Sequence, residues 1–347
     1  MIQNLLRPHI AALKPYASAR DEYTGSEGVF LDANENPIGS VTAAMYNRYP
    51  DPYQKAVKQT LAKIKGVAEA QIFLGNGSDE AIDLLFRAFC EPHQEEAIIL
   101  PPTYGMYEVS ASINAVKVVQ VPLTRDFQLD VPAILQAITP KTKMLFICSP
   151  NNPTGNLLRQ EDILQILEAF QGIAIIDEAY IDFAPEASWL PRLSEFPRLV
   201  VIQTFSKAWG LASLRLGMAF ASEELIAILN KIKAPYNING VSQALLADSL
   251  QYERFKDEMV ARILLQRQSL ATALQALPYV EKVFPSDANF LLVKMQQPKA
   301  VYDFLLEDKI IVRDRSKVLL CEGCLRISVG TKEENEALIE KMKSFVG

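Results

Sequence analysis

Histidine is scarce in this chain, which contains only His9 and His93 among its 347 residues. A Ser-His-Asp hydrolase needs a histidine within hydrogen-bond reach of its serine, and neither histidine lies near a plausible nucleophile. Cysteine is almost as rare, with four residues, of which Cys321 and Cys324 form the sequence CEGC. A zinc site would need a second such pair or more histidines, and Cys324 runs into the strand-like LRISVG rather than a helix. We therefore expect no metal site and do not favour a redox centre.

Long apolar runs are also missing, since no uninterrupted stretch is long enough to cross a membrane. Arg7, Pro8 and Lys14 interrupt the N-terminal stretch, which is unlike a signal peptide, so we expect a cytoplasmic protein. The net charge of −6 argues against a non-specific nucleic-acid binder. The composition, 49% hydrophobic and 22% charged, is ordinary for a globular protein, and the length favours two domains.

Apolar runs typical of buried strands alternate with helical patterns through the middle of the chain. The alternation predicts an α/β fold, with a mostly parallel central sheet flanked by helices. The strand-like runs lie at 97–100, 117–121, 144–148, 173–177, 199–203 and 217–221, and the helical patterns at 78–89, 159–170 and 222–232.

The pattern changes after about residue 235. A helical region at 241–277, either one bent helix or two, precedes shorter strands and one more helix, which is typical of a small α+β domain. We predict a large domain at 32–240, a small C-terminal domain at 241–347, and an N-terminal segment at 1–31 that packs with the small domain or with a partner subunit.

Unusual polar residues follow several of these apolar runs. Lys207 comes shortly after the strand-like 199–203, where α/β proteins bind their ligands, and such a lysine is a candidate to form a Schiff base. Asp177 ends a wholly apolar strand. Its carboxylate is therefore either buried at a cost in free energy or paired with a cation. The turn at 148–156, CSPNNPTGN, holds two asparagines between prolines, which favours an aimed side chain.

The fourth polar stretch is FLGNGSDEAIDLL, at 73–85. Its glycines allow close backbone approach, and Ser78 and Asp79 open a helix whose N-terminus attracts phosphate. A plain helix cap remains the simpler interpretation of this stretch alone. Taken together, the lysine, the carboxylate, the asparagine, the helix start and Arg215 suit pyridoxal phosphate, whose ring nitrogen needs a carboxylate partner.

The motifs GNGSDE, PTYGMY, SPNNPTG, DEAY, SKAWGLASLRLG and LRISVG resemble the fold-type-I pyridoxal-phosphate aminotransferases of classes I and II. LDANENP, RYPDP and the final IIVRD…CLRISVGT are similar to the histidinol-phosphate aminotransferase subfamily. The resemblance implies transfer of an amino group between histidinol phosphate and 2-oxoglutarate, giving imidazole acetol phosphate and glutamate in histidine biosynthesis. It also implies a homodimer with pyridoxal 5'-phosphate as cofactor, and neither a nucleic-acid nor a membrane partner.

The resemblance further implies a role for each matching residue. Lys207 would bind the cofactor covalently and move the proton, Asp177 would pair with the ring nitrogen, and Tyr104 would stack on the ring. Asn152 and Tyr180 would hydrogen-bond its phenolic oxygen. The groups implied for the cofactor phosphate are the backbone N–H groups of Gly77, Ser78 and Asp79, the side chains of Ser206 and Arg215, and Tyr49 of a neighbouring subunit.

Substrate binding is implied for two arginines, Arg326 and Arg313, which would face the substrate phosphate or the glutamate carboxylate. Tyr16, Asn34 and Tyr236 are further substrate candidates. Related enzymes with the same cofactor cage remain alternatives, namely an aromatic amino-acid aminotransferase and a threonine-phosphate decarboxylase. A dehydrogenase is disfavoured because the glycine fingerprint after the first strand is missing, and a DNA-binding regulator because no added domain fits within residues 1–30.

Overall fold

The structure is a computed structural model, and it describes residues 2–16 and 27–345. Its larger sheet has seven strands in the order β1-β7-β6-β5-β4-β2-β3. Only β7 runs antiparallel to its neighbours, and the other pairs are parallel. The strands are β1 (Ile72–Asn76), β2 (Glu96–Ile99), β3 (Lys117–Gln120), β4 (Thr142–Cys148), β5 (Ile173–Asp177), β6 (Leu199–Thr204) and β7 (Leu216–Ala221).

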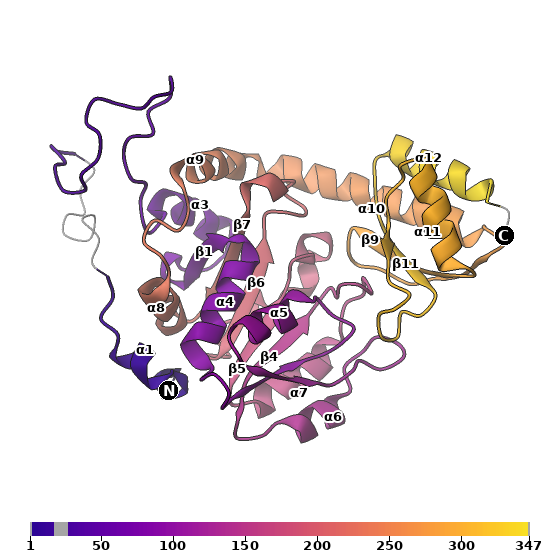
Figure 1. Ribbon diagram of the computed structural model, residues 1–347, viewed down its shortest axis with the longest axis horizontal. Helices are drawn as coiled ribbons and strands as arrows, with labels where there is room; N and C mark the ends of the chain where they lie inside the picture. The colour runs from indigo at the N-terminus through magenta and orange to yellow at the C-terminus, as the bar shows by residue number, and fades with distance from the viewer. Residues whose placement is uncertain (1, 17–26, 346–347) are drawn as a thin grey trace.

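Helices cover both faces of this sheet (Figure 1). On one face the apolar side chains pack against α4 (Gly77–Phe89), α5 (Met106–Ile113) and α8 (Glu223–Ile232). The other face packs against α3 (Lys55–Lys65), α6 (Val131–Ala137), α7 (Gln160–Ala169) and α9 (Gly240–Ser249). The predicted mostly parallel sheet with helices on both faces is therefore confirmed. No helix of the described residues is long and apolar enough to span a bilayer.

The helical region at 241–277 is two helices rather than one. A 3-10 turn at Leu250–Tyr252 separates α9 from α10 (Glu253–Gln275). Figure 1 shows α10 as a long rod that leads from the large sheet to the small one. α9 itself contacts α3, and the predicted boundary at residue 240 stays a prediction.

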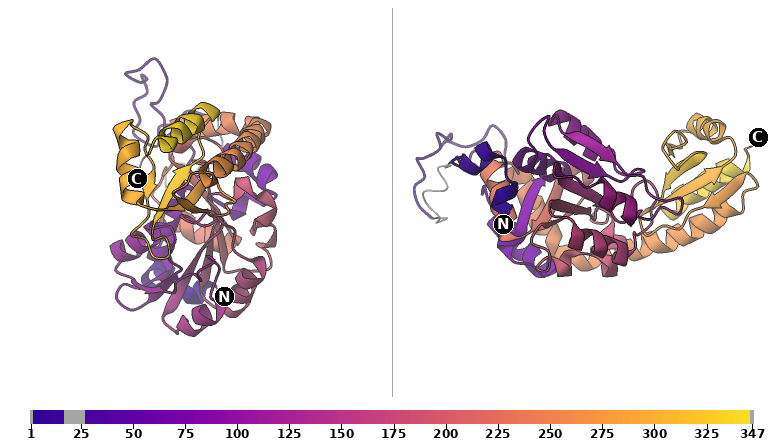
Figure 2. Two further views of the ribbon diagram at one scale, coloured as in Figure 1. Left: turned by 90° about the vertical axis from the view of Figure 1, so that its right-hand side faces the viewer. Right: turned by 90° about the horizontal axis from the view of Figure 1, so that it is seen from below.

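The smaller sheet is antiparallel, with the order β10-β11-β9-β8. Its strands are β8 (Val280–Val283), β9 (Phe290–Met295), β10 (Arg313–Asp314) and β11 (Cys324–Ser328). It has its own apolar core, to which α10, α11 (Pro298–Glu307) and α12 (Lys332–Lys343) contribute. Figure 2 shows this unit displaced to one end of the molecule, joined to the large sheet by α10.

The described part of the N-terminal segment contacts the large sheet's helices. Its short helices are η1 (Ile2–Leu5) and α1 (Pro8–Ala12). Arg7 pairs with Glu91 beyond the end of α4 at 3.2 Å, and Lys231 of α8 donates to the carbonyl of Ile10 at 2.8 Å. The predicted packing of segment 1–31 with the small domain or with a partner subunit stays a prediction. Residues 1 and 17–26 lie outside the described residues.

Candidate active site

A cavity of about 630 Å³ lies at the carboxyl ends of β4, β5 and β6, beside the start of α4 and facing β10 and β11. Because parallel strands end at the same edge of a sheet, polar residues that follow different strands meet there. The cavity brings together most of the residues singled out from the sequence. These are Gly77, Ser78, Asp79, Tyr104, Asn152, Asp177, Tyr180, Ser206, Lys207, Arg215, Arg313 and Arg326.

Asp177 is a buried carboxylate at the end of β5, with 3% of its surface exposed. The Tyr107 hydroxyl donates to its Oδ2 at 2.6 Å, and the backbone N–H of Ala179 donates to its Oδ1 at 3.0 Å. No lysine or arginine of the described residues lies within 4 Å of it. Burial raises the pKa of Asp177 to about 6 although both hydrogen bonds lower it. Of the two alternatives that the sequence leaves open for this carboxylate, the described residues show the desolvated one.

Lys207 reaches the same cavity from the loop after β6. Its Nζ lies 5.6 Å from the centre of the Tyr180 ring. Burial is the largest cause that lowers the pKa of Lys207, and the charges of Arg326 and Arg215 lower it further. The residue is nevertheless exposed, because its side chain lies in the open cavity. The lowered pKa increases the fraction of the Lys207 amine that is neutral at a given pH.

The start of α4 forms the wall of the cavity opposite the arginines of β10 and β11. Asn76 occupies the N-cap without capping the helix through its side chain, so the plain-cap interpretation of this stretch is wrong. The N–H of Gly77 donates to the carbonyl of Arg215 at 2.7 Å. The N–H groups of Ser78 and Asp79 have no partner among the described residues. Two backbone donors at a helix start are thus available to an anion.

A glycine on β7 permits this arrangement. A Cβ on Gly217 would lie 2.2 Å from the backbone nitrogen of Ser78, so no side chain fits between β7 and α4. The same approach places the Arg215 guanidinium beside the helix start, where its Nη2 is 3.8 Å from Oδ2 of Asp79 and its Nη1 is 3.5 Å from Oγ of Ser206. The cation therefore lies next to the two available N–H groups.

The two asparagines in the turn after β4 have different roles. Asn151 is buried and donates to the carbonyl of Pro102 and to the hydroxyl of Thr154, at 2.9 and 2.8 Å. Asn152 instead lines the cavity and accepts a hydrogen bond from Arg326. One asparagine therefore braces the turn while the other is aimed into the cavity, as the density of turn residues predicts.

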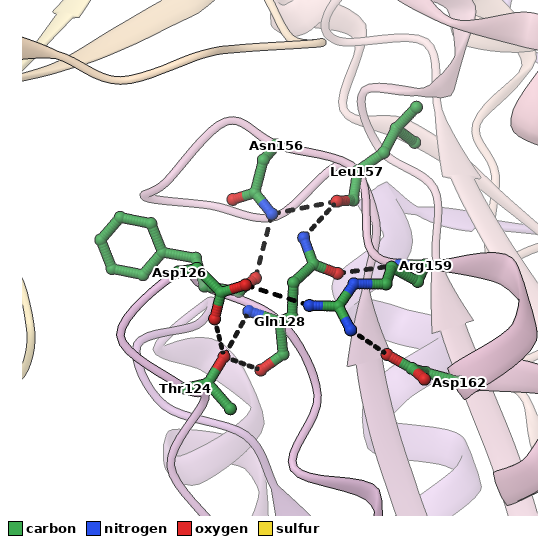
Figure 3. A network of polar contacts seen from close by, with 8 residues as sticks. Thr124, Asp126, Gln128, Asn156, Leu157, Arg159 and Asp162 are labelled. Atoms are coloured by element: carbon green, nitrogen blue, oxygen red, sulfur yellow. Dashed lines mark hydrogen bonds and ion pairs between the residues drawn. The ribbon is translucent and has the colours of Figure 1, made fainter.

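A polar network fixes the far end of this turn (Figure 3). Asn156 donates to the carbonyls of Phe127 and Leu157, both at 3.0 Å. Gln128 donates to the same Leu157 carbonyl at 3.1 Å and accepts from the N–H of Arg159 at 2.9 Å. The network ties the turn to the loop before α6, which limits the movement of Asn152. Its other members are Thr124, Asp126 and Asp162.

Three arginines on or next to the small sheet line the cavity opposite the large sheet: Arg313 and Arg326 lie in β10 and β11, and Arg315 follows β10. Arg313 and Arg326 are directly opposite each other in the β10–β11 pair, and Arg315 lines the cavity beside them. Like charges opposite each other destabilise an antiparallel pair. None of the three has a carboxylate within 4 Å among the described residues, and Nε of Arg315 is buried without a hydrogen-bond partner. This positive wall suits an anionic ligand.

Two tyrosines expected near the cofactor line the cavity. The Tyr104 hydroxyl donates to Oδ1 of Asp79 at 3.2 Å, and its ring packs edge-on against Tyr107. Tyr180 is buried and packs edge-on against Phe290. Burial is the largest cause that raises the pKa of both phenols, so both are neutral at ordinary pH.

Four other predicted residues lie away from this cavity. Tyr49 stacks on Tyr236 with ring centres 4.6 Å apart, and both line a second groove of about 850 Å³ together with Asn34. Tyr16 is exposed at 74%. The structure therefore does not bring these residues to the cavity of their own chain.

Both cysteines of CEGC are buried: Cys321 lies in the loop between β10 and β11, and Cys324 is the first residue of β11. Burial raises the pKa of Cys321 to about 12 and that of Cys324 to about 11. Thiols with raised pKa values are unreactive. In the part of the chain that the structure describes, no cluster of histidine, cysteine and acidic residues could hold a metal ion.

Two residues of the site were missed by the sequence reasoning. Tyr107, whose hydroxyl bonds Asp177, is one of two tyrosines in PTYGMY, and nothing local marks it out as the buried one. Arg315 follows Arg313 by two residues, so alternation along an extended stretch would have placed both on one face.

Comparison with known proteins gives consistent results. The family model described as aminotransferase class I and II matches residues 26–342. A histidinol-phosphate aminotransferase of Cytophaga hutchinsonii is 56% identical over 344 residues, covering 99% of each chain.

Solved structures show the same fold. The histidinol-phosphate aminotransferase from Clostridium acetobutylicum has a TM-score of 0.80 at 24% identity, covering 86% of this chain and 90% of that one. The one from Sinorhizobium meliloti, in complex with pyridoxal-5'-phosphate, has a TM-score of 0.79 at 23% identity, covering 90% and 89%. The predicted fold class and resemblance are confirmed.

Proposed function

The chain belongs to the class I and II aminotransferases, and from that premise we propose that it transfers the amino group between histidinol phosphate and 2-oxoglutarate. The products are imidazole acetol phosphate and glutamate, and the cofactor is pyridoxal phosphate. The name of the relative that is 56% identical over nearly the whole chain supports this substrate. The site geometry supports the cofactor on separate grounds.

The observation that carries the cofactor proposal is Asp177. A buried carboxylate without a cation is costly, and this one lies in the same cavity as a lysine of lowered pKa. A protonated ring nitrogen would supply the missing cation. At the other side of the cavity, the N–H groups of Ser78 and Asp79, with Arg215 and Ser206, form a cradle for a phosphate. The residues present therefore fit pyridoxal phosphate.

Each residue of the site has a distinct task in this proposal. Lys207 would bond covalently to the aldehyde carbon, and Asp177 would pair with the protonated ring nitrogen. Asn152 and Tyr180 would form hydrogen bonds with the phenolic oxygen. When bound, the cofactor provides a sink for the electrons left on the substrate carbon that loses its proton. Tyr107 and the Ala179 N–H hold the Asp177 carboxylate in place.

Lys207 is the proposed general base. Its lowered pKa leaves a larger fraction of Nζ neutral than for an ordinary lysine. Nζ would be released when the substrate amine takes its place on the aldehyde carbon, and the free, neutral Nζ would then take the proton from the amino-bearing carbon of the amino substrate. In the opposite direction the charged Nζ delivers a proton to the corresponding carbon derived from the keto substrate. Arg326 and Arg215 lower the pKa of Lys207 through their charge, so the positive surroundings favour the neutral base.

The three arginines on or next to the small sheet are proposed to hold the substrate's anionic end. Histidinol phosphate presents a phosphate and glutamate presents a carboxylate, and both anions are recognised by the fork of donors on a guanidinium. Arg326 is held by Asn152 and lies against the Phe290 ring at 5.2 Å. Arg313 and Arg315 add two positive charges beside Arg326, which favours a larger or doubly charged anion.

The protein is further proposed to act as a homodimer. Residues 27–54 contain no helix or strand, and they expose many large apolar side chains. An exposed apolar patch of this kind is typical of an interface. In a dimer, Tyr49 could reach the phosphate cradle of the other chain, which agrees with its distance from the cavity of its own chain. The exposed residues are Val29, Leu31, Ile38, Val41, Met45, Tyr46, Tyr49 and Tyr53.

The experiment that tests the reaction compares three amino donors. The enzyme loaded with pyridoxal phosphate is mixed with histidinol phosphate, glutamate or phenylalanine, and the visible absorbance of the cofactor is followed. Histidinol phosphate and glutamate should each discharge the absorbance rapidly, and phenylalanine much more slowly. Faster reaction with phenylalanine would instead indicate an aromatic aminotransferase. In a parallel incubation with threonine phosphate, release of carbon dioxide would indicate a decarboxylase.

A further inference from the structure

Glu178 is a buried carboxylate to which the proposed reaction assigns no task. It follows Asp177 at the end of β5 and has only 1% of its surface exposed. Asp177 contacts Tyr107, in the core on the α4 side of the sheet, whereas Glu178 contacts Trp189, in the core on the α7 side. The two carboxylates therefore point to opposite faces of the sheet, and Glu178 cannot contact a ligand in the cavity.

Three hydrogen bonds hold the Glu178 carboxylate. The N–H of Trp189 donates to Oε1 at 2.5 Å. The hydroxyl of Ser188 and the side-chain amide of Gln203 both donate to Oε2 at 2.8 Å. No lysine or arginine of the described residues lies within 4 Å of the carboxylate. Burial raises the pKa of Glu178 to about 7, although the three hydrogen bonds lower it and so offset part of the cost of burying the charge.

These bonds join two strand ends that carry the proposed catalytic groups. The N–H of Glu178 donates to the carbonyl of Ile202 on β6 at 2.8 Å, and its carboxylate holds Gln203. The next residue, Thr204, accepts from the N–H of Ser206, which precedes Lys207. A continuous chain of bonded residues thus runs beneath the cavity from the end of β5 to the loop of Lys207.

A carboxylate suits this position better than an amide does. Glu178 receives three donors on two oxygens, whereas a glutamine has a single acceptor oxygen and its NH2 group would face at least one of these donors. A buried donor left without an acceptor costs about 1–3 kcal/mol. The resulting rearrangement would change the spacing between the ends of β5 and β6.

We propose that Glu178 is a positioning residue, whose carboxylate fixes the end of β5 to the end of β6 so that Asp177 and Lys207 keep their relative placement. The inference rests on the proposed function, because the placement matters only if both groups act on one cofactor. Displacement of a reacting group by about 1 Å can cost on the order of 100-fold in rate. Groups that bind the substrate's anionic end lie on the small sheet and should be unaffected.

The test compares Glu178→Gln and Glu178→Asp with wild type, and uses Glu186→Gln as a matched control because Glu186 is exposed on the same segment. Four quantities are measured: kcat, KM for glutamate, the Kd of pyridoxal phosphate for the apoprotein, and the Tm of the apoprotein. Glu178→Gln should lower kcat about 10- to 100-fold and weaken cofactor binding, with KM for glutamate little changed. Glu178→Asp should recover part of kcat, and the control should match wild type.

The outcomes separate this inference from the proposed function. If wild type neither binds pyridoxal phosphate nor transaminates, the proposed function fails. If wild type is active and Glu178→Gln keeps its kcat and cofactor affinity, with or without a lower Tm, Glu178 is only structural and the inference is overturned. Should Glu178→Gln fail to fold, Gln203→Met and Ser188→Ala each remove one donor. They should lower kcat in the same direction at constant KM, and normal kcat in both would overturn the inference.

Discussion

The Asp177 carboxylate should lower the free energy of unfolding of the apoprotein, while it raises the affinity for the cofactor. Burial places its pKa at about 6 instead of the ordinary 3.8. The unfolded chain therefore ionises this group at lower pH than the folded apoprotein does. Ionising the buried carboxyl group therefore lowers the stability of the folded apoprotein. This penalty in folding free energy is absent below pH 3.8, grows as pH rises, and is fully present above about pH 6, where it amounts to about 3 kcal/mol.

The Asp177→Asn variant removes this penalty and keeps both hydrogen-bond positions occupied. The amide oxygen can accept from the Ala179 N–H, and the NH2 group can donate to the Tyr107 hydroxyl oxygen. We expect the apoprotein of the variant to be more stable than the wild-type apoprotein by about 1–3 kcal/mol at pH 8, and by about half as much at pH 5. Cofactor affinity and activity should fall sharply because the ring nitrogen loses its anionic partner.

The assay is denaturant unfolding of both apoproteins at pH 5 and pH 8, combined with a titration of each apoprotein with pyridoxal phosphate. Asp248→Asn, at an exposed position of α9, is the matched control and should change neither quantity. The reasoning would be refuted by an Asp177→Asn apoprotein that is no more stable than wild type at pH 8. It would equally be refuted by a variant that binds the cofactor as tightly as wild type.

Three further substitutions test other parts of the site. Lys207→Ala should fold, yet show no steady-state transamination because the proton carrier is lost; turnover near the wild-type rate would remove Lys207 from this role. Arg326→Ala should raise KM for glutamate and for histidinol phosphate, since it removes a guanidinium from the anion-binding wall; unchanged KM values for both would place it outside the site. Arg315→Gln should weaken the binding of histidinol phosphate more than that of glutamate, because a phosphate dianion gains more from a third cation than a carboxylate does. An equal fall in kcat/KM for both substrates would contradict a role of Arg315 in selecting the phosphate.

The strand ends were predictable because the apolar runs and the polar loops alternate so regularly. Once β4, β5 and β6 are parallel neighbours, Asn152, Asp177 and Lys207 meet at one edge whatever the remaining details. β1 was missed because a glycine in IFLGN weakens a strand pattern, and here that stretch pairs antiparallel with β7.

Other features depend on packing that local patterns do not encode. The exposure of Lys207 in the cavity, the bond from Tyr107 to Asp177 and the opposite aim of Glu178 arise from how several elements meet. The positions of Tyr49 and Tyr236 away from the cavity illustrate a further limit of a single chain, because the role predicted for Tyr49 needs a second subunit.

The central claim is that Lys207 bonds covalently to pyridoxal phosphate in the cavity that contains Asp177. The most direct measurement is borohydride reduction of the cofactor-loaded protein, followed by digestion and mass spectrometry of the peptides. The peptide that contains Lys207 should carry the reduced cofactor in nearly stoichiometric amount. Label on a different lysine, or an unlabelled Lys207 peptide in a protein that has bound the cofactor, would contradict the account.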